Sequence, residues 1–515
     1  MKFVISLTVL LCGVIAGIGA TTPPAEAAGN ARHVVIVVWD GMRPDFVDEQ
    51  HTPALWKLAS RGVIFTRHHA VYPSATNVNG TAMATGVYPG HSGIIANHEF
   101  RPEINDHTAV DTTDASTVGK GDGLSGNKYL AVPTIATLVR QSGGRTIVAA
   151  SKTIGLLLDR EVATNVTQNS VTLFAGDVLP HEALARITAA LGPFPKHHLE
   201  QDAWTTKTLD LFWKENLPAL SVLWLGEPDL TQHETAPGDP AALAAIKSSD
   251  QNLAQVLADL DRLHATENTD IFVVSDHGFS TIERTVDLRK ILTDAGFDAI
   301  TQSSAAPKRG QIMMAGNGGT VLFYVIGHDA ALIRRLVEFL QQSDFAGVIF
   351  TRQKMEGTFG FDAANVDSAQ APDVEMAFRW TDRKSANGVA GMIDADWQRE
   401  AGKGTHATLS RFDMHNILFA TGPDFRTGYR DDLPSGNIDL APTVLQILGI
   451  DRPPAIDGRV LNEAMVGSHG ETPTPQTDTL EASKRFSSGT WRQTLKITRV
   501  GSTIYLDEGN GDFRP

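Results

Sequence analysis

The chain has a single cysteine, Cys12, in 515 residues. Cys12 lies in the apolar N-terminal stretch, so a processed protein would have no cysteine and could form neither a disulfide nor a thiolate metal site. Histidine and carboxylate side chains would have to hold any transition metal. Positive charge is also scarce, with 44 Lys and Arg against 59 Asp and Glu residues. The formal charge of −15 argues against a nucleic-acid scaffold.

The N terminus reads MKFVISLTVLLCGVIAGIGATTPPAEAA. One lysine, an apolar run and a final Ala-x-Ala predict a signal peptide over residues 1–27, cleaved before Ala28. The protein is then expected to be periplasmic or secreted, with no membrane span in its mature form. A transmembrane anchor is the alternative, disfavoured by the small and polar residues and the proline pair. The bulky Leu11 before Cys12 disfavours a lipid anchor.

The remaining composition, 42% apolar and 20% charged, is that of a globular protein. Short apolar runs occupy residues 33–40, 145–151, 219–226, 271–278, 320–327 and 415–422. Their continuous apolarity predicts strands buried on both faces, and segments such as 329–343 and 438–450 have helical periodicity. We therefore expect an α/β fold with a doubly wound, mostly parallel sheet flanked by helices, whose sites form at the carboxyl ends of strands.

Four segments are predicted along the chain. The signal peptide is followed by a catalytic domain over residues 28–464, in which the polar, Gly-rich stretch 98–128 forms an insertion near the site or a mobile lid. Residues 465–488 are rich in Pro, Thr and Ser and are expected to form a linker. Residues 489–515 alternate on both sides of a Gly-Ser pair, which predicts a small β-hairpin, either packed on the domain or standing apart.

Acidic and imidazole side chains follow several of the expected strands. Two of them are spaced by four residues in GEPDLTQHE, so they would share one face of a helix. The set comprises Asp40, Asp229, His233, Asp276, His277 and His406. Three carboxylates and three imidazoles suit zinc, and two such ions with open positions could clamp the attacking and leaving oxygens of a phosphoryl transfer. Manganese or iron could occupy such sites as well.

Between about His33 and Gly458, the blocks VVWDGMRPD, YPSATNVNGTAMATGVYPGHSGIIAN, GEPDLTQH, VVSDHGF, GTHATLSRFDMHNILFATGPDF and NIDLAPTVLQILGI occur in this order. In order and spacing they resemble the alkaline phosphatase superfamily, and within it the type I phosphodiesterase/nucleotide pyrophosphatase family. The resemblance implies an alkaline-phosphatase-like fold. It also implies two Zn²⁺ per subunit, with Asp40, Thr76, Asp276 and His277 on one ion and Asp229, His233 and His406 on the other.

The same resemblance implies that Thr76 is the nucleophile, activated by zinc, and that Asn97 donates a hydrogen bond to a nonbridging phosphoryl oxygen. The expected protein is an exported two-zinc hydrolase of phosphodiester or pyrophosphate bonds in small phosphorylated substrates, acting through a phosphothreonine intermediate. The helix that orients its N–H groups toward this anion is expected to begin near Asn79. Capping or packing is the expected role of Ser74, Thr81 and Thr85.

Two departures leave the substrate open. Asn77 and Thr81 stand where nucleotide pyrophosphatases commonly carry aromatics that sandwich a base. Other aromatics could replace them, for example Phe100, Trp204 or Trp224.

The stretches SATNVNG and TQHETAPGDP also resemble phosphonoacetate hydrolase. Lys152 is a candidate cation for binding the substrate, or else a solvated loop residue. The alternatives are a phosphomonoesterase, a phosphonate hydrolase, a transferase to another alcohol and, outside the enzymes, a non-catalytic binding protein.

Overall fold

The structure is a computed structural model that describes residues 29–160, 170–468 and 472–515. The expected signal peptide lies outside the described residues. Within these three ranges, no helix combines the length and apolarity needed to cross a bilayer.

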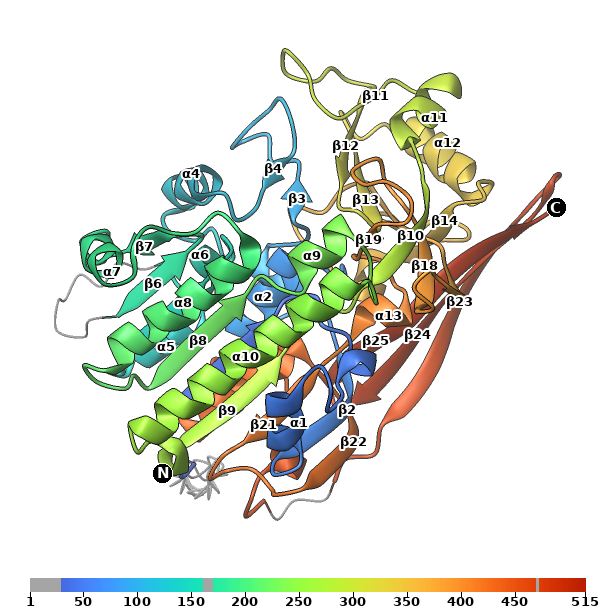
Figure 1. Cartoon of the computed structure of the whole chain (residues 1–515). Coiled ribbons are helices and arrows are strands. Elements are labelled where there is room, and N and C mark those ends of the chain that lie inside the picture. The colour runs from blue at the N-terminus through green and yellow to red at the C-terminus, as the bar shows by residue number, and fades with distance from the viewer. Residues whose placement is uncertain (1–28, 161–169, 469–471) are drawn as a thin grey trace, which may run out of the picture.

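A ten-stranded, mostly parallel sheet forms the centre of the molecule (Figure 1). In spatial order its strands are β20 (His415–Asn416), β2 (Val63–His69), β21 (Leu418–Thr421), β9 (Thr269–Val274), β1 (His33–Trp39), β8 (Leu220–Leu225), β5 (Thr146–Ala150), β6 (Val171–Phe174) and β7 (Asp177–Leu179), and β22 (Tyr429–Gly436) pairs with β2. The strands from β9 to β6 are parallel. The expected doubly wound α/β fold is confirmed.

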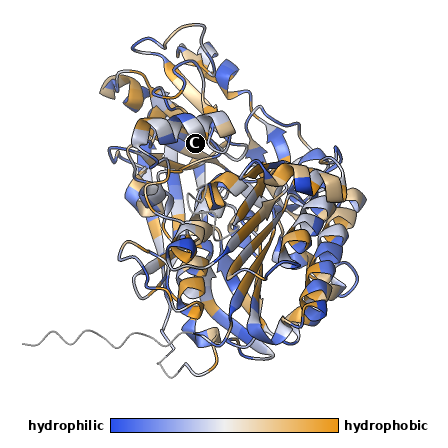
Figure 2. Cartoon of the chain, turned by 90° about the vertical axis from the view of Figure 1, so that its left-hand side faces the viewer, coloured by the Kyte–Doolittle hydropathy of each residue, from blue (hydrophilic) through white to orange (hydrophobic). Residues whose placement is uncertain are grey.

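Helices cover both faces of this sheet, and Figure 2 shows its hydrophobic strands beside helices with mixed surfaces. Along β1, Val34, Ile36 and Val38 face one core, while the residues between them face the other. The first core also contains residues of α2 (Thr76–Thr85), α5 (Ile135–Gln141), α6 (Gly155–Leu158) and α14 (Leu440–Ile447). The second contains residues of α1 (Pro53–Ala59), α7 (Ala183–Leu191), α8 (His198–Trp213) and α10 (Pro240–Arg262). Burial on both faces explains the continuous apolar runs.

The run at 320–327 lies outside the central sheet, contrary to a reading of all six runs as parallel strands. It forms β13 (Thr320–Val325), which pairs antiparallel with β12 (Ile312–Gly316) and β16 (Val374–Phe378). That sheet also contains β11 (Ala299–Ile300), β14 (Ala346–Thr351) and β15 (Phe359–Gly360). One face of β13 shares a core with α11 (Leu288–Asp294) and α12 (Ala330–Gln341), and the other packs with C-terminal strands. A continuous apolar run indicates that both faces of a strand are buried, and an antiparallel strand such as β13 can be buried in this way as well.

A smaller four-stranded sheet lies beside the site. It consists of β17 (Trp380–Lys384), β18 (Ala390–Ala395), β10 (Ser280–Thr285) and β19 (Gly404–Thr405). Helix α9 (Asp229–Glu234) contacts β19, and α13 (Arg411–Met414) packs Arg411 and Phe412 against Trp380 of β17.

The C terminus is a three-stranded sheet of β23 (Gln476–Phe486), β24 (Gly489–Val500) and β25 (Thr503–Arg514). The structure therefore places a strand in residues that we expected to form a linker. Most β23 side chains are exposed, which explains a polar composition like that of a linker. The strand is held in place by backbone pairing with β24 along its length. The sheet packs on the domain through buried residues such as Trp491 and Leu495.

Candidate active site

The predicted site residues meet at the carboxyl end of the central sheet. Asp40 follows β1, Asp276 and His277 follow β9, and Asp229 begins α9 after β8. Because β1 pairs with both β8 and β9, these three chain ends are neighbours. Figure 1 shows α2 and α9 at this edge. All six predicted metal ligands lie here.

The first ligand group surrounds the Thr76 hydroxyl. Thr76 Oγ1 lies 3.4 Å from Asp40 Oδ1 and 3.3 Å from His277 Nε2. His277 Nε2 lies 3.6 Å from Asp40 Oδ1 and 3.2 Å from Asp276 Oδ2. All four side chains are buried. One hydroxyl, two carboxylates and one imidazole thus surround a single point.

The second ligand group is centred on Asp229 Oδ1. His233 Nε2 lies 3.2 Å from it, as expected for residues one helical turn apart in α9. His406 Nε2, from the loop after β19, lies 3.4 Å from the same oxygen. The rings of His277 and His406 stack with centroids 3.7 Å apart, so the two groups adjoin.

Backbone carbonyls orient all three imidazoles in the same way. The contacts are His233 Nδ1 to Gly404 O at 3.0 Å, His277 Nδ1 to Gly278 O at 2.9 Å and His406 Nδ1 to Ser74 O at 2.8 Å. A carbonyl only accepts, so each Nδ1 must carry a proton, and in the neutral imidazole the Nε2 lone pair then faces carboxylates. Two electron-rich atoms facing each other need a cation between them, and this tautomer is the one that binds metal.

The carboxylates have a matching deficit of partners. Asp229 Oδ1 and Asp276 Oδ2 are buried and have no hydrogen-bond partner among the described residues. Burial raises the pKa of Asp276 to about 6, while burial and neighbouring Asp276 raise the pKa of Asp40 well above its usual value. Burial likewise lowers the pKa of His406, with His277 adding to the effect. Divalent cations would satisfy these atoms, and the residues fit them.

Lys152, which follows β5, lies between the two ligand groups. Its Nζ is 2.9 Å from Asp40 Oδ2 and 2.9 Å from Asp229 Oδ2. Burial disfavours its charged form, but Asp229 and Asp40 outweigh this effect and raise the pKa of Lys152 above its usual value. Lys152 is therefore not the solvated loop residue that we considered as an alternative.

The helix that carries Thr76 begins at Thr76 itself, three residues earlier than expected. Ala75 is extended and precedes α2, so Thr76 occupies its first turn, where backbone N–H groups favour an anion. Asn77 N donates to Asn97 Oδ1 at 2.8 Å. This bond orients Asn97 so that its Nδ2 is the donor, as a contact to a phosphoryl oxygen requires.

The other hydroxyls of the YPSATNVNGTAMATG stretch bind backbone. Ser74 Oγ donates to Thr408 O, Thr81 Oγ1 to Asn77 O and Thr85 Oγ1 to Thr81 O, each at 2.7 Å. These contacts agree with the capping or packing roles that we expected.

Three residues support the ligand groups through contacts that the sequence analysis did not predict. Trp224 Nε1 donates to Asp40 Oδ2 at 2.9 Å. Asn79 lies in α2, and its Oδ1 accepts at 2.7 Å from the backbone N–H of Val71, which precedes the helix. Asp202 accepts from Gly226 N at 2.8 Å and so holds the chain before Asp229. Trp224 lies in the apolar run 219–226, and Asn79 lies in one of the blocks that resemble the family. Nothing in their spacing distinguishes either residue from a core residue. Asp202, in α8, lies outside those blocks and far along the chain from its partners.

None of the three candidate aromatics offers an open stacking face. Trp224 is fully buried, and its indole is bonded to Asp40. Phe100 is buried against Tyr324, and Trp204 is buried against Phe194. Asn77 has no aromatic face and donates from Nδ2 to Thr112 Oγ1 at 2.9 Å.

Thr112 belongs to the segment 98–128, which therefore lies against the site. This segment contains β3 (His98–Glu99), β4 (Val110–Asp111) and α4 (Ala115–Ser125), and it follows α3 (Pro89–Ser92). Thr113 Oγ1 also lies 2.8 Å from Thr153 Oγ1, next to Lys152.

Comparison with known proteins places this arrangement in a family. Residues 34–383 match the family described as type I phosphodiesterase / nucleotide pyrophosphatase. The chain is 22% identical over 294 residues to human ectonucleotide pyrophosphatase/phosphodiesterase family member 5, covering 55% of this chain and 53% of that protein. It is 25% identical over 266 residues to venom phosphodiesterase 2 of Crotalus adamanteus, covering 51% and 28%. The chain thus spans about half, or less, of the length of these relatives.

Solved structures share the fold. Murine ectonucleotide pyrophosphatase/phosphodiesterase 5, an inactive form in complex with AMP, superposes with a TM-score of 0.59 at 16% identity, covering 82% of this chain and 96% of that one. The human counterpart gives 0.61 at 15% identity, covering 84% and 100%. The overall fold is therefore shared with these ectonucleotide pyrophosphatase/phosphodiesterase structures. The chain belongs to the type I phosphodiesterase/nucleotide pyrophosphatase family, whose profile covers more than half of it.

Proposed function

We propose that this protein is an exported hydrolase that cleaves phosphodiester or pyrophosphate bonds with two zinc ions and Thr76 as nucleophile. Asp40, Thr76, Asp276 and His277 would hold one ion, and Asp229, His233 and His406 the other. Bound zinc would supply Lewis acidity, which lowers the pKa of a neighbouring hydroxyl and neutralises charge on the phosphoryl group. Residues 28–464 form the catalytic domain in this proposal.

The chain's own residues carry two displacements. Thr76 Oγ attacks phosphorus and loses its proton, and the P–O bond to the leaving group breaks, so that this group departs with a proton. Water then attacks the phosphothreonine, the bond between phosphorus and Thr76 Oγ breaks, and the Thr76 hydroxyl is restored. Asn97 Nδ2 and the N-terminal turn of α2 donate to the phosphoryl oxygens.

The observation that supports the proposal most directly is the position of Thr76. Its Oγ1 lies within 3.4 Å of both an aspartate and an imidazole of one ligand group, at the N terminus of α2. A hydroxyl placed only for packing would bond to a backbone carbonyl, as Thr81 does in the same helix.

Thr76→Ala tests the nucleophile. We expect hydrolysis of bis-p-nitrophenyl phosphate to fall by about 1,000-fold or more, with the melting temperature unchanged. Thr81→Ala removes a hydroxyl from the same helix and should retain most activity. Chelation should inactivate the wild type, and zinc should restore it. Wild-type rates in Thr76→Ala, with metal content intact, would refute the proposal.

A phosphomonoesterase or phosphonate hydrolase is the second candidate. The ammonium of Lys152 inside the site favours it. So does the lack of a stacking platform for a base, since position 77 is an asparagine and Phe100, Trp204 and Trp224 are buried. Rates on p-nitrophenyl phosphate, its bis-ester, a nucleoside diphosphate and phosphonoacetate separate the candidates. A monoester rate well above the diester rate would favour the second one.

Export also belongs to the proposal. The relatives include ectoenzymes and venom proteins. Amino-terminal sequencing of the protein recovered from the periplasm or medium should begin at Ala28. An intact Met1 in the mature enzyme would contradict it.

A further inference from the structure

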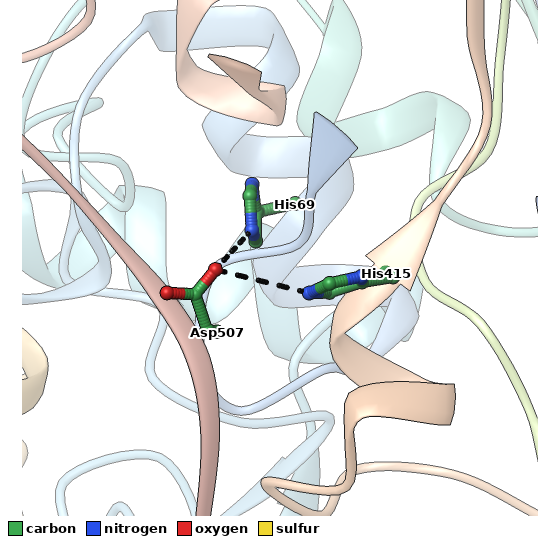
Figure 3. Close-up of side chains that lie close together, drawn as sticks. All are labelled: His69, His415 and Asp507. Atoms are coloured by element: carbon green, nitrogen blue, oxygen red, sulfur yellow. Dashed lines mark hydrogen bonds and ion pairs between the residues drawn. The ribbon is translucent and has the colours of Figure 1, made fainter. Parts of the chain in front are cut away.

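A second group of metal-ligating side chains lies away from the active site, where the C-terminal sheet meets the central sheet (Figure 3). His69 ends β2, His415 begins β20, and the two are direct cross-strand partners. Asp507 reaches them from β25. The ligating atoms of all three residues lie within 4.8 Å of one another. The group therefore joins three strands that are far apart in the sequence.

Hydrogen bonds to the outer atoms of His69 and Asp507 orient the inner atoms of both side chains toward the group. His69 Nδ1 lies 2.9 Å from Ser435 O, a carbonyl that can only accept, so Nδ1 carries the proton. Thr498 Oγ1 donates to Asp507 Oδ2 at 2.6 Å and leaves Oδ1 facing the imidazoles. Fixed outer atoms with inner lone pairs are the arrangement that supports metal ligands. The three catalytic histidines have the same pattern of Nδ1 bonded to a carbonyl.

His415 supplies the least satisfied atom. Its Nε2 is buried and has no hydrogen-bond partner among the described residues, although 35% of the side chain is exposed. A buried lone pair without a donor is unfavourable unless a cation accepts it.

The distances need only small movements to close on one ion. His69 Nε2 lies 2.9 Å and His415 Nε2 3.9 Å from Asp507 Oδ1. Tetrahedral zinc with bonds of about 2.1 Å separates its ligand atoms by roughly 3.4 Å, so each of these two contacts to Asp507 has to change by about half an ångström. The rings are nearly perpendicular, at 77°, and do not block each other.

A competing account uses protons and arginine alone. A doubly protonated His69 could pair with Asp507 at 2.9 Å, and Arg67 Nη2 lies 3.6 Å from the same oxygen. The Arg67 side chain is 35% exposed and could turn toward solvent. The ion-pair account gives His415 Nε2 no role, whereas a bound metal would use it as a ligand. The two accounts therefore differ in what they predict for His415.

We propose that His69, His415 and Asp507 bind a structural divalent transition metal, best matched by zinc, that fastens the C-terminal sheet to the central sheet. Two imidazoles and one carboxylate suit zinc and leave one position of a tetrahedral ion for a further ligand. The ion would be distinct from those of the active site. Each of its ligands lies outside the catalytic ligand set, so the proposal stands apart from the proposed function.

The test counts zinc in wild type, His415→Gln and His91→Gln after removal of metal, reloading with Zn²⁺ and desalting. His91→Gln is the matched control, because His91 pairs with Asp457 at 2.7 Å and has no third ligand in the described residues. We expect His415→Gln to hold one zinc ion fewer per chain than wild type and His91→Gln. Its diesterase activity should remain, and zinc should raise its melting temperature less than that of wild type.

Equal zinc content in wild type and His415→Gln would overturn the proposal in favour of the ion-pair account. Asp507→Asn gives a second measurement should His415→Gln fold poorly. The metal account predicts the same deficit of one zinc ion in Asp507→Asn. Reduced stability of Asp507→Asn with full zinc content would also refute the site.

Discussion

Lys152 sets the charge balance of the metal-free active site. With all three carboxylates ionised, as metal binding requires, they and this ammonium give the group a charge of about −2; two divalent cations would change it to about +2, which favours an anionic substrate. A monoester dianion carries more negative charge than a diester and should depend more on an extra cation. The preference between these substrates is therefore expected to depend on Lys152.

We predict that Lys152→Met lowers kcat/KM for p-nitrophenyl phosphate by about tenfold more than for the bis-ester, a difference of about 1.4 kcal/mol in transition-state stabilisation. Lys403→Met is the control. Lys403 Nζ donates to Glu234 O beside α9, so that variant removes an equal charge without removing a partner of Asp40 or Asp229. Equal losses on both substrates in Lys152→Met would contradict the prediction.

Glu375 is a buried carboxyl that the proposed function does not use. The side chain is fully buried, and burial raises its pKa from 4.5 to about 8, against the lowering effect of the neighbouring Tyr72 hydroxyl. Between these two values the folded protein keeps a proton that the unfolded chain has lost. The contribution of Glu375 to the free energy of unfolding therefore falls as pH rises from about 4.5 to about 8.

Glu375→Gln should remove this dependence. Relative to wild type, the variant should gain about 2 kcal/mol in free energy of unfolding between about pH 5.5 and pH 7.5, measured by urea denaturation. Glu481→Gln, at an exposed carboxylate of β23, should show no such gain. A constant difference between Glu375→Gln and wild type across this range would count against the buried, protonated carboxyl.

At the scale of elements, α2 must approach the central sheet closely for Thr76 to reach the proposed metal ligands. Gly80 allows this approach, because a Cβ there would lie 2.7 Å from Ile154 Cδ1 and 3.0 Å from Trp224 Cη2. Trp224 in turn donates to Asp40. A side chain at Gly80 would therefore displace both the helix of the nucleophile and the support of a metal ligand.

Gly80→Val is expected to lower the free energy of unfolding by about 1–3 kcal/mol and to reduce diesterase activity. Adding Ile154→Ala should restore part of both, since it removes the nearest atoms. Gly119→Val in α4, where a Cβ meets nothing within 4 Å, is the control for valine in a helix. Full activity and stability in Gly80→Val would show that the packing is looser than the structure indicates.

At the scale of the whole molecule, the C-terminal sheet completes a core that it shares with α12 and the six-stranded sheet. Trp491 is fully buried together with α12 and the six-stranded sheet, and its Nε1 donates to Gly357 O at 2.9 Å. Trp380 Nε1 donates to Gly509 O at 2.8 Å in the opposite direction. We therefore expect the sheet and the domain to unfold together.

Trp491→Ala should lower the free energy of unfolding by about 3–5 kcal/mol, because it leaves a large cavity. Arg492→Ala, whose side chain is exposed on the same strand, should change it by no more than about 0.5 kcal/mol. Calorimetry of wild type should give one cooperative transition. A separate low-temperature transition that Trp491→Ala alone shifts would show that the sheet unfolds independently.

The sequence by itself determined the α/β class and predicted a set of side chains that meet at the carboxyl end of the central sheet. Apolar runs report burial on both faces, and Asp229 and His233 are one helical turn apart, so short-range periodicity carries this information. The blocks around Asp40, Thr76, Asp276 and His406 added the family resemblance. Their meeting point follows from parallel strands, whose carboxyl ends share one edge of the sheet.

Only the tertiary structure decided the partners of Lys152, the start of α2 at Thr76, the antiparallel pairing of β13 and the packing of β23 to β25. The group of His69, His415 and Asp507 likewise became visible only in the folded chain. Each of these depends on contacts between residues far apart in the sequence, such as Lys152 with Asp40. Local composition and periodicity determine burial and element type, but they carry no information about which distant side chains meet.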